Sequence, residues 1–166
     1  MISPGWVRMM ARYNEWQNAW LVPAIETLGD EEARRHRGAF FGTVLGTANH
    51  VLWADEVWLS RFRGVPIDAG GIDGSVDWTD SVSDWAVRRR ETDMGLLEWA
   101  EGLEDCEGDV SWWSGVLKRQ ASRPKSILYT HIFNHQTHHR GQIHAMLTAA
   151  GIETGTTDLA FMPEAT

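Results

Sequence analysis

The sequence predicts an all-α protein, a four-helix bundle with a short β-hairpin before the last helix. Four long segments carry apolar residues at steps of three and four, and the connections between them are polar or rich in glycine. The chain has 166 residues and 43% hydrophobic content, enough for the core of one ordinary domain. We therefore expect a single domain over residues 1–166.

The first half of the chain contains two of these helices. Residues 4–28 form an amphipathic pattern that Pro23 should interrupt or kink and Gly29 should end. After the polar residues 31–37, residues 41–62 are apolar on most sides and rich in small side chains. This second segment is typical of a central, largely buried helix.

The third helix follows a long connection. Residues 64–77 contain four glycines, one proline and several aspartates, which predicts an irregular loop. Asp80 or Ser81 is a suitable N-cap for a helix that ends near Leu103.

The hairpin and the last helix complete the chain. Valine, tryptophan and serine around Gly115 predict a short hairpin within residues 109–123. Pro124 suits the first turn of a helix that reaches Ala150, with Gly151 as its C-cap.

Composition excludes several classes of partner. The net charge of -8 disfavours nucleic acid, and we interpret the triplet Arg88-Arg89-Arg90 as a solvated helix face.

The single Cys106 cannot form an intrachain disulfide, which fits a reducing cytoplasm. The sequence shows neither a signal-peptide pattern nor an apolar run of membrane-spanning length. We expect a cytoplasmic protein that does not span a membrane.

Histidines are concentrated in the predicted last helix. Five of the seven lie in the segment from His131 to His144. Alternating steps of four and three place one inward-facing stripe on this helix: Leu128, Ile132, His135, His139, Gln142 and Met146. His135 and His139 therefore stand where leucines would be expected.

A metal ion is one way to satisfy two imidazoles in an apolar seam. Side chains four residues apart lie on the same helix face, so His135 and His139 can converge on one ion. His50, with small neighbours in the second helix, is the candidate third ligand. The alternative is hydrogen bonding without metal, and for His50 alone the spacing does not separate the two. Three imidazoles suit zinc, nickel, copper or iron(II) and leave a coordination position open.

Other residues complete the predicted pocket. His131, one turn before His135, is a pocket residue that can act as a fourth ligand, a proton carrier or an outer partner, and Gln142 is placed in the pocket by the stripe. His138 points away from His139 and should lie at the pocket edge or in solvent.

No general base is evident. Gln136 stands where a zinc protease of the HExxH kind needs glutamate. Asp55 and Glu56 lie more than one turn from His50 and are interpreted as charged edge residues. Gly141, in mid-helix, suggests a close helix contact beside the site.

The run Asn134-His-Gln-Thr-His-His-Arg-Gly-Gln142 closely resembles the signature of the DinB-like (DinB/YfiT) family of four-helix proteins. Supporting similarities are Tyr13-Asn14-Glu15-Trp16, the Asn49-His50 pair and Asp158-Leu-Ala-Phe-Met162. The resemblance implies a bundle in which one histidine of the second helix and an HxxxH pair of the last helix hold the metal. In this chain these are His50, His135 and His139.

The resemblance also implies zinc or nickel as the metal and a homodimer as the assembly. Better-understood cousins in the family are transferases and isomerases that use a low-molecular-weight thiol such as mycothiol or bacillithiol. We expect a metal-dependent thiol S-transferase acting on a small molecule. The alternatives are a non-catalytic metal-binding protein of a stress response and a metal-dependent hydrolase. This chain carries no thiol-recognition signature that would choose among them.

Overall fold

The computed structural model describes residues 2–115 and 117–164. Its elements, in chain order, are helix α1 (Pro4–Ala33), helix α2 (Val44–Arg63), the 3-10 helix η1 (Ile72–Asp77), helix α3 (Val82–Glu101), strands β1 (Asp109–Ser114) and β2 (Arg119–Pro124), helix α4 (Lys125–Ala149) and the 3-10 helix η2 (Leu159–Phe161).

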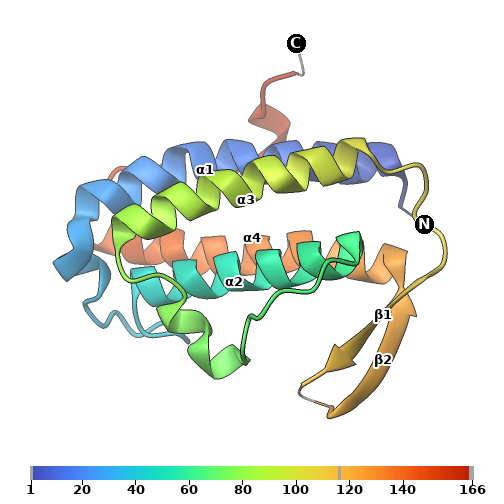
Figure 1. The fold of residues 1–166 in the computed structure, drawn as a ribbon. Coiled ribbons are helices and arrows are strands. Elements are labelled where there is room, and N and C mark those ends of the chain that lie inside the picture. Colours follow the sequence, from blue (N-terminus) through green and yellow to red (C-terminus); the bar gives the residue numbers. More distant parts are fainter. Residues whose placement is uncertain (1, 116, 165–166) are drawn as a thin grey trace.

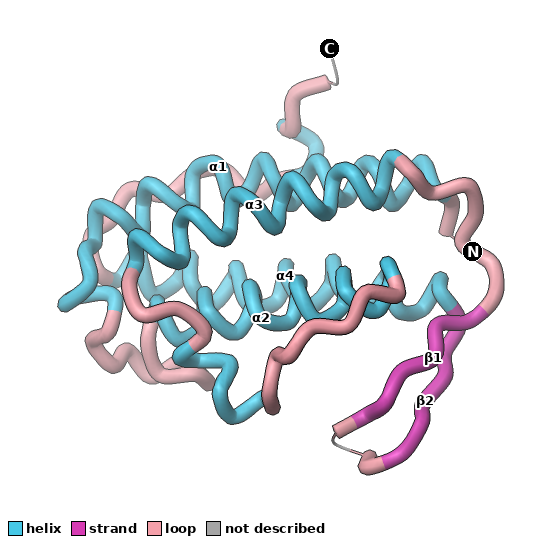
Figure 2. The backbone as a smooth tube through the Cα atoms, viewed as in Figure 1, coloured by secondary structure: helices cyan, strands magenta, loops and turns pink. Residues whose placement is uncertain are grey.

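The four long helices form two layers (Figure 1), which confirms the predicted bundle. α1 lies beside α3 in one layer, and α2 lies beside α4 in the other. Figure 2 shows the hairpin of β1 and β2 extending from one end of the bundle, next to the start of α4. The N-terminus lies at the same end, whereas the C-terminal segment leaves the α1–α3 layer on its outer side.

The core consists of two apolar clusters separated by buried polar residues. One cluster joins the second half of α1 to the first halves of α2 and α3 and the end of α4. The other joins the opposite ends of the same helices. Each of the four long helices has buried polar side chains in its middle part, between the residues that it contributes to the two clusters: Asn14, Asn18, Asp55, Arg89, Asp93, Gln136 and Arg140. We call these seven residues the polar layer.

Helix α1 differs from the prediction in where it bends. It begins after Ser3, whose side chain accepts a hydrogen bond from the backbone N–H of Trp6 at 3.2 Å. The helix continues through the exposed Pro23, so the expected interruption there is wrong. The break lies at Gly29, with φ 76° and ψ 164°, and one further helical stretch follows to Ala33.

Helix α2 begins at Val44, three residues later than predicted, because Thr43 caps it and accepts from the N–H of Gly46 at 2.9 Å. Gly64, in the left-handed conformation with φ 68°, ends the helix. The following segment is not entirely irregular, since residues 72–77 form η1. Ser75 of η1 is fully buried.

The remaining elements follow the predicted order. Ser81 caps α3 and accepts from the N–H of Asp84 at 3.0 Å. β1 and β2 pair antiparallel, which confirms the hairpin. Pro124 ends β2 in an extended conformation, and α4 starts one residue later. Gly151, with φ 78°, follows the helix, whose end is closed by a bond from Ile152 N–H to Leu147 C=O at 3.0 Å.

No helix within residues 2–115 and 117–164 combines the length and the apolarity needed to cross a membrane.

Candidate metal centre

Three histidines converge at the interface of α2 and α4. Their candidate ligand atoms all lie within 4.8 Å of one another in His50, His135 and His139. The Nε2 atoms of His50 and His135 are 3.1 Å apart, and the ring of His139 lies 4.9 Å from that of His50 and 4.5 Å from that of His135. This is the set that the sequence singled out. The three side chains are positioned to bind one metal ion.

Hydrogen bonds orient two of the rings. The Nδ1 atom of His50 lies 2.9 Å from the hydroxyl of Ser75, and the Nδ1 atom of His139 lies 2.8 Å from Gln142 Oε1. Because an amide oxygen only accepts, the His139 Nδ1–H donates to it. His139 is then the tautomer with its hydrogen on Nδ1, and the lone pair on Nε2 is available to bind a metal ion.

Burial keeps the cluster neutral. Burial, and to a lesser degree repulsion from neighbouring imidazolium charges, lowers the pKa of His135 to about 3 and that of His50 to about 4. The pKa of His139 is also lowered, again mainly by burial. Neutral imidazoles are the form that binds transition metals, so the site is in its binding form at pH 7.

Aromatic rings form one wall of the cluster. The ring of Phe41 stacks on His50 at 4.0 Å and lies 5.5 Å from His139. The ring of Trp53, one turn after His50, is also stacked with the His50 ring, with the ring centres 5.9 Å apart and an interplanar angle of 28°. The sequence pattern placed Phe41 at the start of the second helix. In the structure Phe41 precedes α2, and its ring packs over His50.

Two further histidines border the site without joining the convergent group. The exposed His131 lies 5.7 Å from the ring of His135 and 5.4 Å from that of Trp58. The exposed His138 lies 4.7 Å from the ring of His139, with its Nε2 atom 3.3 Å from Gln142 Nε2. Gln142 therefore lies against His139, where its Oε1 atom is hydrogen-bonded.

The segment that carries Ser75 is fastened to α2 directly beside His50. Asn49 donates to the carbonyl of Val76 at 3.0 Å, and its own amide oxygen accepts from the hydroxyl of Thr79 at 2.7 Å. Loop composition gave no signal for the role of Ser75, because its position depends on these contacts between distant residues. Of the two adjacent α2 residues, Asn49 thus binds the segment that carries Ser75, and His50 belongs to the histidine cluster.

The polar layer overturns two predictions. Asp55, expected at an edge, is 0% exposed, and Arg89, expected on a solvated face, is 1% exposed. The Arg89 guanidinium lies 2.7 Å from Asp55 and 2.8 Å from Asp93. These ion pairs compensate for the cost of burying the charges. The charges of neighbouring residues in the sequence do not reveal such pairs, because the partners Arg89 and Asp55 lie on different helices.

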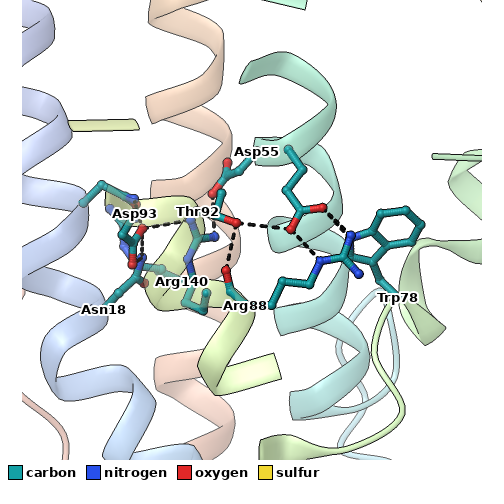
Figure 3. A network of polar contacts seen from close by, with 10 residues as sticks. Asn18, Asp55, Trp78, Arg88, Thr92, Asp93 and Arg140 are labelled. Carbon is teal, nitrogen blue, oxygen red and sulfur yellow. Dashed lines mark hydrogen bonds and ion pairs between the residues drawn. The ribbon is translucent and has the colours of Figure 1, made fainter. Parts of the chain in front are cut away.

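Asparagines and a second arginine extend this network across the bundle (Figure 3). Asn14 and Asn18 donate to Asp93 at 3.0 and 2.9 Å, and Arg140, next to His139, donates to Asn14. Burial raises the pKa of Asp93 to about 6 and raises that of Asp55, although Arg89 lowers both. The layer ties α4, at the residue after a candidate ligand, to the opposite side of the bundle.

Glu56 and Gly141 also differ from expectation. Glu56 is half-buried, accepts two bonds from Arg88 at 2.8 and 2.7 Å, and accepts from Trp78 Nε1 at 2.9 Å; Figure 3 labels the two donor residues. Gly141 is exposed, and apart from its chain neighbours and the backbone of its own helix no atom of the described residues lies within 4 Å of the position a Cβ would take. The helix contact predicted for this glycine is therefore wrong.

Comparisons with known proteins agree with this architecture. A similar protein, Protein DinB of Bacillus subtilis, is 27% identical over 153 residues, covering 88% of this chain and 87% of the relative. The crystal structure of a DinB-like protein from Bacillus cereus superposes with a TM-score of 0.62 at 20% identity, over 86% of this chain and 91% of that one. The family model described as the DinB family matches residues 3–166. The chain belongs to the DinB family.

Proposed function

We propose that the protein binds one divalent transition metal, zinc or nickel, through His50, His135 and His139, and uses it to transfer a low-molecular-weight thiol to a small molecule. The convergence of three neutral imidazoles within 4.8 Å carries this proposal. Nitrogen donors of this kind suit both metals, and three protein ligands leave a position for substrate.

The residues around the site fit such chemistry. A bound ion would supply Lewis acidity that lowers the pKa of a thiol, so the protein need not provide a general base. No carboxylate of the described residues joins the histidine cluster. Ser75 and Gln142 orient the rings, and Phe41 shields one side of the cluster from water.

A non-catalytic metal-binding protein is the second candidate, because the three histidines come from two helices and an ion there would clamp α2 to α4. Metal-dependent hydrolysis has less support. Asp55, the buried acid of the same helix as His50, is engaged by Arg89 and is not available as a base.

Metal content tests the first half of the proposal. Tag-free protein purified without nickel should contain about one equivalent of metal by mass spectrometry, and His50→Ala, His135→Ala and His139→Ala should each lose it. His36→Ala, at an exposed position, is the matched control and should retain the metal. Metal-free wild-type protein, even after incubation with zinc or nickel, would contradict the proposal.

Thiol binding tests the second half. Isothermal titration of the metal-loaded protein with a panel of cysteine-based thiols should show saturable binding that disappears in His135→Ala. Binding of metal but of no thiol would overturn the transferase proposal and favour the clamp.

A further inference from the structure

A pocket lies next to the candidate metal centre. It is an open cavity of about 580 Å³ between α2, residues 64–70 and β1, and its lining includes Trp53, Arg61, Trp112 and Trp113. Volumes in this range suit small-molecule ligands. The pocket shares Trp53 with the metal centre, since this indole also stacks toward His50, and its Nε1 donates to Ala69 C=O at 2.7 Å.

Arg61 is the unusual residue of this pocket. Its guanidinium lies 4.5 Å from the ring centre of Trp58 and 5.4 Å from that of Trp112. Arg88 and Arg89 are paired with carboxylates, whereas Arg61 makes no ion pair or side-chain hydrogen bond with any residue in 2–115 or 117–164. Burial lowers its pKa, as expected of a cation that has lost part of its hydration.

The geometry around Arg61 favours a planar anion. The indoles of Trp58 and Trp112 face the guanidinium, but the N–H donors of a guanidinium lie in its own plane and point along its edges. Those edges match the two oxygens of a carboxylate. Asp68 lines the same pocket, and its negative charge disfavours a ligand with a second anionic group.

We propose that this pocket binds a small monocarboxylate, with Arg61 as the counter-ion of its carboxylate. As the substrate site of the metal centre, this inference rests on the proposed function. His50 and Arg61 are eleven residues apart on α2, about 16 Å of helix axis, and the Arg61 side chain leans back over Trp58. A thiol substrate that reaches both points is therefore of dipeptide size or larger.

A thiol-free probe tests the pocket separately from the metal. N-acetylglycylglycine should quench tryptophan fluorescence of the metal-free protein saturably, and its neutral amide should not. Arg61→Gln should weaken binding by about tenfold or more, and Arg61→Lys, which keeps the charge but not the fork of donors, should fall between. Arg63→Gln, an exposed position on the same helix, is the control and should leave affinity unchanged.

Equal affinity in Arg61→Gln, equal binding of the neutral amide, or no binding by folded wild-type protein would overturn the proposal; circular dichroism would verify the fold of each variant. N-acetylcysteinylglycine with metal-loaded protein then separates the two ideas. Thiol binding that ignores Arg61→Gln would remove the carboxylate site and leave the metal function standing. Carboxylate binding that depends on Arg61 but is not strengthened by the metal and the thiol would support the carboxylate site and contradict the proposed thiol transfer.

Discussion

The hydroxyl of Ser75 holds the His50 ring through Nδ1, at 2.9 Å, and so leaves Nε2 facing the other histidines. Ser75→Ala should lower affinity for zinc about 10–100-fold, the usual cost of losing a hydrogen bond that orients a ligand. Competition with a chromophoric chelator measures this affinity. Ser83→Ala, at an exposed position in α3, should have no effect. Equal affinity in both variants would show that Ser75 does not orient the ligand.

The lowered histidine pKa values predict how the metal-free protein responds to acid. The folded pKa values of His135 and His50, about 3 and about 4, lie below the ordinary 6.5. Between pH 6.5 and 4 the unfolded chain therefore binds protons that the native state does not. The free energy of unfolding should fall as pH falls through this window, by on the order of 1–2 kcal/mol per histidine between pH 7 and 5.

Urea unfolding of metal-free protein at a series of pH values measures this loss. His135→Gln should flatten the profile, because the substituted residue does not titrate, whereas the exposed His36→Gln should not. Identical profiles for wild type and His135→Gln would contradict the prediction.

Individual residues of the site differed in how far sequence alone could place them. His135 and His139 were predictable because helical spacing puts them on one buried stripe. His50 needed the family resemblance, since one histidine inside a helix is ambiguous. Ser75 and Phe41 were not predictable, because both reach the site from non-helical segments whose path depends on tertiary contacts.

At the scale of elements, α3 depends on one of its three consecutive arginines. Arg89→Ala would leave Asp55 and Asp93 buried without their shared cation and should destabilise the protein by about 3–5 kcal/mol. The neighbouring Arg90→Ala removes only an exposed pair with Glu26 and should cost about 0–1 kcal/mol. Denaturant unfolding measures both. Similar losses for the two arginines would mean that the buried pairing adds little.

The segment after α4 is held against α1 by close contact. A Cβ on Gly155 would lie 2.5 Å from the indole of Trp20, whereas at Gly74 the described residues beyond its local backbone place no atom within 4 Å of the corresponding position. Gly155→Ala should therefore destabilise the protein by about 1–3 kcal/mol, and Gly74→Ala should be nearly neutral. Thermal unfolding of the two variants provides the comparison, and equal melting temperatures would argue against tight packing here.

The four helices and the hairpin were predictable from periodicity and turn residues, but their boundaries were less so. Pro23 is tolerated because it lies on the exposed face of α1, and periodicity alone does not reveal which face is solvated. η1 was missed because a short 3-10 helix has no apolar period and this one is held by contacts with α2.

For the whole molecule, an ion at the histidine cluster would connect the two helices of one layer. Ligands that bind only the native state stabilise it by about 2.7 kcal/mol at 100 times the dissociation constant. Removal of the metal should then lower the melting temperature by roughly 5–10 °C for a chain of this size. Calorimetry with and without chelator measures the shift; His135→Ala, which lacks a ligand, should show none. An unchanged melting temperature for wild type would contradict the clamp.

The polar layer crosses all four helices at one level, and this fixes their longitudinal register. A slip of any helix by one turn, about 5.4 Å, would move a charged member of the layer into an apolar cluster or take it away from its partner. Apolar packing alone tolerates such slips more readily than a buried polar contact does. The Nε2 atoms of His50 and His135, 3.1 Å apart, can meet only when α2 and α4 are level. The buried charges thus hold α2 and α4 in the register that the histidine cluster needs, although none of them is a candidate ligand.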